Sequence, residues 1–550
     1  MRRAIAAALA GAVLVLTGCV AIPDSGPVRE GVVDMSEQED GLVFLAQEPE
    51  DGATQEEIIV GFLSAGISPD DGFSIAREFL TETEAQQWRP GANVIVRAGP
   101  PEVSFGSETE ATAVVSAISE VSGTGALQRP AGDRALEFLM QREDGEWRIA
   151  DAPDGIVLSS FHFAELFRAH SLHWLTPDGT RAVPEVRWFE RTATTAASRI
   201  IDALLAGPST WLSPAVATAA AAEARRVGEP QVEGTRMTVT IDFTQVQQMG
   251  AVSLQPLATQ LALSLRTVGV REVVVQVEAR DGLSASSADA PPLDVGSVDQ
   301  RPLVLDGTSL RSLGAGASTI DDVGPRLQAI GATSYTVGAE GGVAHTGSTA
   351  VWIEAGADPV VISADTASVP TVDDSGWVVL QERAVPQRLL AWRDGERAEL
   401  QLPPSPDRIA ALELSRDGSR LAVVTVGGDS SQVVVVAIVR DAEGRPVSLG
   451  EPYRLPLLDG AAIDVTWSSP TQIAVLATGG DQAQIVMHVV GGDSEQLPAP
   501  GVPVRSLVGG SEGISTLRAL GDDGSLLALR GRVWTAADDL GPITLIATQQ

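Results

Sequence analysis

A group of four residues in the first third of the chain carries the side chains best suited to binding a metal ion. These are His162, Glu165, His170 and His173. Zinc-binding helices usually pair two histidines four residues apart with a glutamate between them, whereas His170 and His173 are three apart. Their neighbours are largely aromatic, and histidines in such surroundings commonly pack and form hydrogen bonds. We therefore predict packed histidines here, with no metal site and no cofactor.

A second chemical pattern is Gly509-Gly510-Ser511-Glu512-Gly513, which has the G-x-S-x-G spacing of a hydrolase nucleophile elbow. That elbow needs a strand, a sharp turn and a helix, followed later in the chain by an acid and a histidine. Here residues 514–519 are predicted to be a strand, and no histidine follows His488. We therefore interpret the motif as a glycine-rich loop and predict no catalytic residue in it.

Gly314-Ala315-Gly316 begins a pattern found in dinucleotide-binding turns, but Thr319 occupies the position of the third glycine. No helix is predicted directly after it, as the phosphate-binding motif requires. We interpret this segment as a loop too.

Charge and composition exclude several classes of function. The 550 residues include 72 acids, 38 basic residues that are all arginine, and a net charge of −34. Without lysine there is no Walker-type phosphate-binding lysine and no Schiff-base nucleophile. The strong negative charge repels phosphate backbones, so we predict no nucleic-acid partner. Together with the patterns above, this composition indicates a protein that is not an enzyme.

The N-terminus has the features of an export signal. Arg2 and Arg3 precede an apolar run over residues 4–16. As a helix this run rises about 20 Å, which is short of the roughly 30 Å hydrocarbon core of a bilayer. We therefore predict a signal peptide over residues 1–18 rather than a permanent membrane span.

The only cysteine, Cys19, follows this signal directly. The segment Leu16-Thr17-Gly18-Cys19 resembles the lipobox of bacterial lipoproteins. That resemblance implies cleavage after Gly18, a diacylglycerol on the Cys19 thiol and a palmitoyl group on its amine, which would anchor the chain at the extracytoplasmic face of the cell membrane. Two alternatives remain: Cys19 is an ordinary apolar residue ending a signal peptide, or the segment is an uncleaved anchor. A single cysteine leaves no intramolecular disulfide.

Composition and hydrophobic periodicity divide the chain into segments. We predict a signal peptide (1–18), an acidic tether (19–50), an N-terminal α+β domain (51–160), a connector (161–192), an α/β domain (193–282), a linker (283–305) and an all-β C-terminal domain (306–550).

The first two domains show helical and strand periodicities in different orders. The N-terminal one has amphipathic helices at 55–64 and 74–87, followed by short alternating strands with a turn at Asp144-Gly145. The second has a strand at 236–243, a helix at 254–268 and a strand at 272–278. Because this order needs a crossover connection, we predict that the two strands pair in parallel.

The C-terminal region carries a repeated turn followed by an apolar strand. The turns are Asp374-Ser375-Gly376, Ser415-Arg416-Asp417-Gly418, Trp467-Ser468-Ser469-Pro470 and Asp522-Asp523-Gly524. Their spacing of about 40 to 55 residues is typical of four-stranded propeller blades, and five or six blades fit the length. A β-sandwich with similar turns is the alternative.

The order of these parts resembles the actinobacterial lipoprotein LpqB family, which combines a lipobox, an N-terminal domain, a GerMN-type domain and a propeller. The matching segments are Pro23–Val28, Ile59–Leu63, Ala76–Thr81, Trp88–Pro90, Leu175–Gly179, Arg187-Trp188, Leu204–Ser209, Gln260–Val270 and Val273–Val275. Pro184-Glu185 and Leu172-His173-Trp174 depart from the family pattern. The resemblance implies a membrane-anchored partner of the extracytoplasmic domain of an MtrB-type sensor histidine kinase.

Three functions follow as hypotheses. The first is a lipoprotein that modulates an MtrA/MtrB-type two-component system in cell-envelope homeostasis and division. The second is a non-catalytic envelope lipoprotein that binds a cell-wall glycan or a small ligand. The third is an envelope hydrolase that depends on Ser511.

Overall fold

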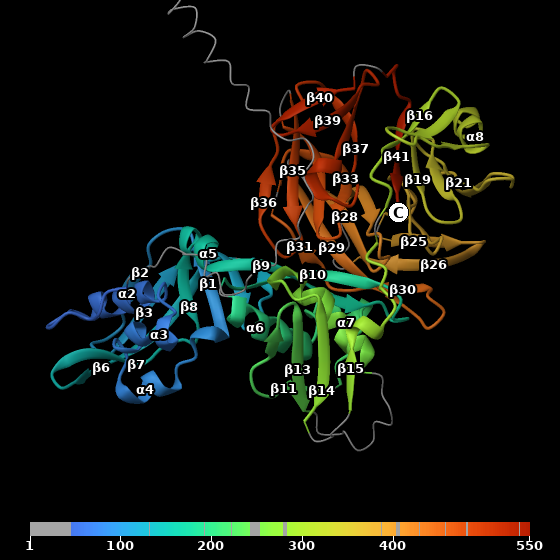
Figure 1. Ribbon diagram of the computed structural model, residues 1–550. Coiled ribbons are helices and arrows are strands. Elements are labelled where there is room, and N and C mark those ends of the chain that lie inside the picture. Colours follow the sequence, from blue (N-terminus) through green and yellow to red (C-terminus); the bar gives the residue numbers. More distant parts are fainter. Residues whose placement is uncertain are drawn as a thin grey trace, which may run out of the picture. The chain divides into compact units, whose positions relative to one another are not determined.

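The chain folds into several domains, mostly of β-sheet, with a propeller at its C-terminal end (Figure 1). The computed structural model describes residues 46–130, 132–191, 193–221, 223–242, 254–278, 283–296, 298–386, 388–402, 408–427, 430–456, 458–479, 482–537 and 540–550. All of these belong to one compact unit, Asp40–Gln550. None of the helices among them combines the length and the apolar character needed to span a bilayer.

The first described helix, α2 (Gln55–Ala65), begins at a capping box. The Thr54 hydroxyl accepts from the Glu57 amide at 3.3 Å, and the Glu57 carboxylate accepts from the Thr54 amide at 2.7 Å. The apolar residues at helical spacing lie on its buried face. This helix was predicted within one residue.

The second predicted helix, over 74–87, is wrong because the chain forms two short helices there, α3 (Asp70–Arg77) and α4 (Glu82–Gln87). Between them the Ile149 amide donates to the Phe79 carbonyl at 2.9 Å, and the Thr81 amide donates to the Ile149 carbonyl at 2.9 Å. Backbone groups that a continuous helix would use are thus bonded to a strand. Thr81 then caps α4 through its side chain.

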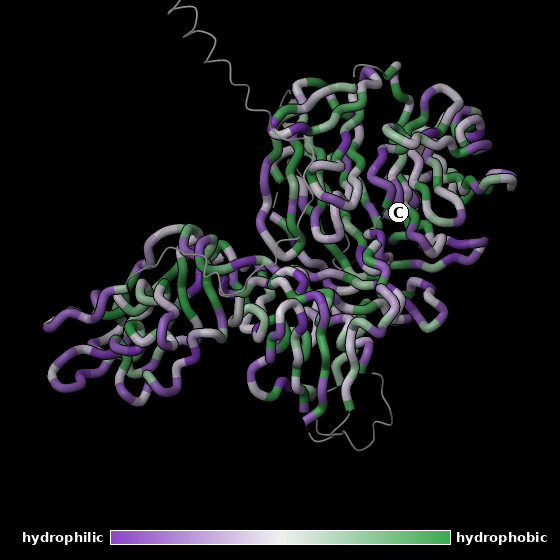
Figure 2. The backbone as a smooth tube through the Cα atoms, viewed as in Figure 1, coloured by the Kyte–Doolittle hydropathy of each residue, from purple (hydrophilic) through white to green (hydrophobic). Residues whose placement is uncertain are grey.

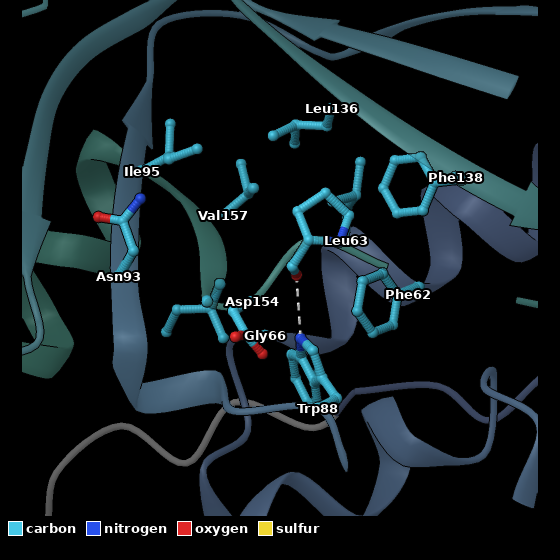
Figure 3. A pocket seen from close by; sticks show the side chains of 13 residues that line it. Phe62, Leu63, Gly66, Trp88, Asn93, Ile95, Leu136, Phe138, Asp154 and Val157 are labelled. Atoms are coloured by element: carbon cyan, nitrogen blue, oxygen red, sulfur yellow. Dashed lines mark hydrogen bonds between the residues drawn. The ribbon is translucent and has the colours of Figure 1, made fainter. Parts of the chain in front are cut away.

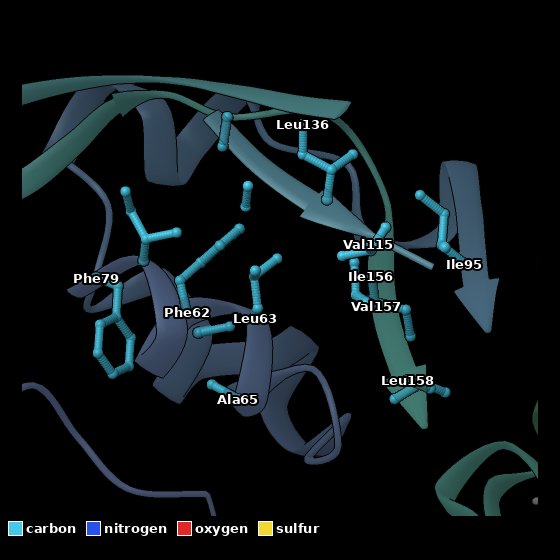
Figure 4. Close-up of a cluster of buried hydrophobic side chains, with 14 of the residues drawn as sticks. Phe62, Leu63, Ala65, Phe79, Ile95, Val115, Leu136, Ile156, Val157 and Leu158 are labelled. Atoms are coloured by element: carbon cyan, nitrogen blue, oxygen red, sulfur yellow. The ribbon is translucent and has the colours of Figure 1, made fainter. Parts of the chain in front are cut away.

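Two four-stranded sheets complete this domain. One has the order β5 (Leu127–Gln128), β4 (Ala117–Ser122), β1 (Asn93–Arg97) and β8 (Ile156–Ser159); the other has β2 (Glu102–Phe105), β3 (Glu110–Val115), β6 (Arg134–Glu143) and β7 (Glu146–Asp151). The predicted turn at Asp144-Gly145 joins β6 and β7. Figure 4 shows the core formed where α2 meets strands from both sheets.

The segment predicted as a connector folds into helix α5 (Ser160–Leu166) and a hairpin of β9 (Phe167–Leu175) and β10 (Ala182–Glu190). Four apolar side chains of this hairpin belong to the core of the middle domain: Leu172, Trp174, Val183 and Phe189. The hairpin therefore forms because burying these side chains against α6 (Ala193–Ala206) and α7 (Gln255–Ser264) stabilises it.

The middle sheet confirms the predicted parallel pair. Strand β13 (Arg236–Asp242) pairs in parallel with β14 (Glu272–Val277), and α7 with the short helix η3 (Leu265–Val268) lies between them in sequence. The sheet also contains β11 (Arg225–Arg226), β12 (Gln231–Glu233) and β15 (Ser284–Ser286). The last of these lies in the predicted linker and extends the sheet beside β14.

In the described residues the propeller has six units of at least four strands each. Blade 1 has β41 (Leu545–Gln549), β16 (Leu303–Asp306), β17 (Ser309–Ser312) and β18 (Thr319–Ile320), and blade 2 has β19 (Ser334–Val337), β20 (Gly342–His345), β21 (Ala350–Ile353) and β22 (Val360–Ser363). Blade 3 has β23 (Thr371–Val372), β24 (Val378–Gln381), β25 (Arg388–Arg393) and β26 (Glu396–Gln401), and blade 4 has β27 (Ile409–Leu414), β28 (Arg420–Gly427), β29 (Ser430–Arg440) and β30 (Pro446–Leu449), with β31 (Tyr453–Arg454) and β32 (Leu458–Asp459) added to β29. Blade 5 has β33 (Ala461–Ser469), β34 (Gln472–Gly479), β35 (Gln482–Val489) and β36 (Ser494–Gln496), and blade 6 has β37 (Val504–Val508), β38 (Arg518–Gly521), β39 (Leu526–Arg530) and β40 (Val533–Ala536). A short helix, α8 (Val323–Ala329), joins blades 1 and 2.

The ring closes through a late strand that completes the first blade. β41 pairs antiparallel with β16 and parallel with β19, so residues 545–549 lie between strands that come more than 200 residues earlier. Figure 2 shows hydrophobic residues along many of the propeller strands and hydrophilic residues in many of the connections. Several of these strands, among them β20, β21 and β24, are buried along their whole length.

Three of the four repeated turns lie between the first and second strands of a blade, at residues 373–377, 415–419 and 469–472. The fourth, Asp522-Asp523-Gly524, lies between the second and third strands of blade 6. The predicted alignment of that turn is therefore wrong. In blade 6 the first connection is a longer loop that contains the helix η5 (Gly513–Thr516). The G-x-S-x-G motif lies in this loop and ends at the first residue of η5.

Candidate functional site

Cys19, the predicted lipidation site, and the cleavage point after Gly18 lie outside the described residues. The same holds for the acidic tether up to residue 45. Lipid attachment at Cys19 therefore remains a prediction.

The four residues considered for metal binding lie on two elements, with His162 and Glu165 on α5 and the other two histidines on β9. His162 is on α5, where its Nδ1 is 3.1 Å from the Ser159 hydroxyl. His170 and His173 are both on β9, and their odd spacing places them on opposite faces of the strand. Among the described residues no cluster of three or more potential ligands could hold a metal ion.

The two histidines of β9 are packed groups. The His170 Nδ1 lies 2.9 Å from the Thr267 hydroxyl, and the His173 amide donates to the Ser264 hydroxyl at 2.9 Å. Burial, assisted by nearby arginines, lowers the pKa of each imidazole to about 4, so both are neutral at pH 7. The His170 ring and the His173 backbone therefore bond the hairpin to the α7–η3 region.

Ser511 is hydrogen-bonded to the segment that precedes β16. Its hydroxyl accepts from the Val298 amide at 2.9 Å, and its own amide donates to the Gln300 side chain at 3.3 Å. Residues 514–519, predicted as strand, form part of η5 and only the start of β38. The local structure is thus a strand, a loop with the single 3-10 turn η5, and a second strand, and not the strand, sharp turn and α-helix of a nucleophile elbow.

Close packing explains the glycines of this motif. A side chain at Gly509 would collide with the Trp467 carbonyl of blade 5, and one at Gly510 would collide with Thr516. The Gly509 amide donates to the Thr466 hydroxyl at 3.0 Å, and its carbonyl accepts from Arg416 at 3.0 Å. Gly509 therefore lets blade 6 approach blade 5 closely. The Gly314–Gly316 segment is a loop between β17 and β18, as predicted.

A buried ion pair lies on the hairpin. Arg187 and Glu185 form an ion pair at 2.9 Å, and their side chains are only 1% and 5% exposed. The same Glu185 oxygen accepts from the Trp174 indole N–H at 2.8 Å. Buried charges persist only when paired and hydrogen-bonded, as these are. We call this set, Trp174, Glu185 and Arg187, the hairpin ion pair.

Both neighbouring domains bond to the hairpin. On the N-terminal side, the Arg187 guanidinium donates to the Thr124 carbonyl at 2.9 Å and to its hydroxyl at 3.0 Å. On the propeller side, the Trp188 indole donates to the Gly491 carbonyl at 2.8 Å, and Arg420 donates to the Pro184 carbonyl at 3.1 Å. The hairpin thus links three domains through directed bonds.

A second group of charges surrounds the start of the hairpin's return strand. Arg181 pairs with Asp374 of blade 3 at 3.1 Å and with Asp294 of the linker at 3.5 Å. In blade 4, the buried Arg420 pairs with Asp417 and stacks over the Trp467 ring at 4.8 Å. Burial alone would raise the pKa of Asp417, but the Arg420 charge and hydrogen bonds lower it overall. These ion pairs connect the hairpin to the linker and to blade 3, and hold Arg420 in place in blade 4.

Two buried carboxyl groups tie successive blades near their first strands. Glu413 accepts from the Trp467 amide at 2.8 Å, linking blade 4 to blade 5, and Asp464 accepts from the Leu507 amide at 2.7 Å, linking blade 5 to blade 6. Burial raises the pKa of Glu413 to about 8 and that of Asp464 to about 7. Each carboxyl therefore holds its proton to a higher pH than usual.

A small cavity in the N-terminal domain is part of its core. Figure 3 shows it between Phe62, Phe138, Ile95 and Trp88, whose indole donates to the Pro153 carbonyl at 3.2 Å. Its volume of about 20 Å³ accommodates a single water molecule. It is too small to bind an organic ligand.

The burial and pairing of Glu185 and Arg187 were not predicted from the sequence. The signal that could have revealed this buried pair is the strand Ala182–Glu190, in which Glu185 and Arg187 are two residues apart among apolar neighbours. Two opposite charges at that spacing share one face of a strand and can pair.

Comparisons with known proteins give a consistent result along the chain. Residues 48–164 match the family described as lipoprotein LpqB, N-terminal domain; residues 171–281 match the family described as sporulation and spore germination; residues 307–544 match the lipoprotein LpqB beta-propeller domain. The lipoprotein LpqB of Streptomyces avermitilis is 26% identical over 95% of this chain and 94% of its own length. That of Cutibacterium acnes is 30% identical over 33% of this chain and 31% of its own.

Solved structures give weaker likenesses. A nidogen/laminin complex chain is 12% identical, with a TM-score of 0.33 over 45% of this chain and 97% of that one. A streptogramin B lyase is 13% identical, with a TM-score of 0.31 over 44% of this chain and 80% of that one.

Proposed function

Because the chain belongs to the lipoprotein LpqB family, we propose that it is a lipid-anchored envelope protein that modulates a sensor histidine kinase of the MtrB type. In this proposal Cys19 carries the lipid at the extracytoplasmic face of the cell membrane. The described domains bind the extracytoplasmic part of the kinase and influence cell-envelope homeostasis and division.

The observation that carries the proposal is the match along almost the entire chain to lipoprotein LpqB of Streptomyces avermitilis, over 95% of this chain. The three family matches follow one another in the order N-terminal domain, middle domain and propeller. The chemistry of the N-terminus agrees with it, since Leu16-Thr17-Gly18-Cys19 offers small residues before the lone thiol.

The hairpin contacts give this proposal a physical basis. An anchor restricts a protein to the membrane plane and raises its effective concentration beside a membrane-bound partner. The Arg187 and Trp188 bonds connect the N-terminal domain, which follows the tether, to the propeller. An anchor at Cys19 would therefore hold the propeller near the membrane as well.

The anchor is tested first. Cys19→Ala should release the chain from the membrane fraction, and mass spectrometry of the parent should show an acylated N-terminal cysteine. Cys19→Ser serves as the closest isostere and should behave like the alanine variant. A parent chain without acyl groups would contradict the proposed anchor.

The kinase role is tested in cells and in vitro. Cys19→Ala and a gene deletion should both alter phosphorylation of the kinase or its response regulator. The purified chain should bind the kinase ectodomain, with peptidoglycan fragments as the competing ligand for the second hypothesis. Unchanged kinase output in both strains, together with no ectodomain binding, would rule out the proposal.

A further inference from the structure

An open cleft of about 860 Å³ lies where blade 6 meets blade 1. Strands β38, β39 and β40 contribute one wall, and β17 with the residues before β16 contributes the other. Small-molecule sites usually measure about 300 to 1,000 Å³. Among the cavities described above, this one alone has room for an organic ligand, since the N-terminal cavity measures about 20 Å³.

The cleft is cationic in a strongly acidic protein. Four arginines line it: Arg301, Arg311, Arg518 and Arg530. Arg301 pairs with Asp299 and Arg311 pairs with Asp306, which cancels the charge of those two. In the part of the chain that the structure describes, neither of the other two has a carboxylate partner within ion-pair distance. The excess positive charge therefore comes from Arg518 and Arg530.

These two arginines lie on one face of blade 6. Arg518 is opposite Ala528 in the antiparallel pair β38–β39, and Arg530 is two residues beyond Ala528. Diagonal neighbours of this kind lie within reach of each other's long side chains. Burial, and then the charge of Arg530, lower the pKa of Arg518, as expected for two cations in proximity. Uncompensated like charges cost stability unless an anion binds between them.

The donor geometry selects the type of anion. One Arg518 nitrogen is held by the carbonyls of Ser515 and Leu517, both at 2.9 Å, which fixes the side chain at the cleft. A guanidinium fork fills both oxygens of a carboxylate, whereas a phosphate has oxygens enough for two forks. Leu313, Leu526 and Leu540 add apolar surface to the same cleft. The ligand should therefore combine a phosphate with an apolar group.

We propose that this cleft binds an organic phosphate, with Arg518 and Arg530 holding the phosphate and the three leucines holding its apolar part. The proposal does not depend on a kinase partner. Asp538 and Asp539 follow the lining residue Ala537 in sequence and lie outside the described residues. The test therefore requires binding by a chain that keeps both aspartates, because acids beside the arginines would abolish binding.

Calorimetric titration of the full chain carrying Cys19→Ala with phenyl phosphate tests the proposal. Arg530→Met should weaken binding by at least about tenfold, since it removes charge-assisted hydrogen bonds. The Arg530 side chain makes no hydrogen bond that the described structure records, so this variant should keep the parent's thermal midpoint. Arg518→Met should weaken binding similarly. Arg532→Met is the matched control and should leave binding unchanged. Arg532 lies two residues after Arg530, in the connection between β39 and β40, and does not line the cleft.

A second arm distinguishes a soluble phosphate from a lipid headgroup. Vesicles of phosphatidylglycerol and of phosphatidylcholine are sedimented with the same variants. Arg530-dependent binding of phenyl phosphate supports a soluble ligand, and Arg530-dependent binding only to phosphatidylglycerol supports a lipid phosphate. Benzoate bound as tightly as phenyl phosphate would overturn the phosphate assignment. No Arg530-dependent binding in either arm would overturn the site.

Discussion

Replacing Arg187 by methionine should strongly destabilise the chain. Methionine is a long apolar side chain that can fill much of the same space, but it removes the charged partner of Glu185, which is 5% exposed. It also removes two hydrogen bonds to Thr124. Breaking a buried ion pair at one partner typically costs about 3 to 5 kcal/mol, because the remaining charge is left buried. We expect a loss of about 4 kcal/mol in the free energy of unfolding.

The magnitude has an internal test in the double variant Glu185→Gln, Arg187→Met. Glutamine can still accept from the Trp174 indole but carries no charge. The double variant should therefore recover about 2 kcal/mol relative to Arg187→Met alone. Arg271→Met, at an exposed arginine just before β14, is the matched control and should change stability by under about 0.5 kcal/mol.

The assay is urea unfolding of the full chain carrying Cys19→Ala, followed by tryptophan fluorescence at its first cooperative transition. Two results would refute the reasoning. One is a stability for Arg187→Met within about 1 kcal/mol of the parent. The other is a double variant as unstable as Arg187→Met, because the cost would then not arise from a buried unpaired charge.

The other predictions concern pH and backbone geometry. Glu413 has a pKa of about 8 in the folded chain and 4.5 ordinarily, so its contribution to stability is full below pH 4.5 and is lost as the pH rises to 8. The variant Glu413→Gln should therefore show a shallower fall in thermal midpoint over that range, and an unchanged slope would contradict the burial argument. His488 has a pKa lowered by burial to about 4 from 6.5, so stability should fall as the pH drops from 6.5 to 4; His488→Gln should reduce that loss, measured by the same thermal scans at acid pH. Gly155→Ala should destabilise by about 3 kcal/mol or more in urea unfolding, because its Cβ would collide with the Asn93 carbonyl at a positive φ; Gly145→Ala, with a positive φ but open space, should cost only about 1 kcal/mol, and equal costs would show that the collision is relieved.

Local signals in the sequence predicted the elements that depend on them. The capping box at Thr54 and Glu57 and the apolar spacing that follows determine α2. The Asp144-Gly145 turn joins β6 and β7 because both residues take the positive φ such a turn needs. The strand–helix–strand order predicted the parallel pairing of β13 and β14, because a helical crossover brings the second strand back in the same direction as the first.

Features that depend on distant partners were not predictable in this way. The break after α3 arises because residues 79–81 bond to Ile149, which lies about 70 positions later. The pairing of β1 with β8 joins segments some 60 residues apart and has no local signature. The cleft arginines come from both ends of the propeller, so only ring closure reveals that they share a site.

The closing strand β41 also determines when this propeller can become complete. A chain is made from its N-terminus, so β16 and β19 exist long before residues 545–549 that must lie between them. Until then both strands have an edge with unpaired backbone groups, which is the kind of edge that recruits strands from other molecules. The Arg518 and Arg530 wall likewise has no opposite wall until blade 1 joins blade 6. Pairing of the final strand therefore ends the period in which the domain is prone to self-association, and it is the step at which the phosphate cleft first exists.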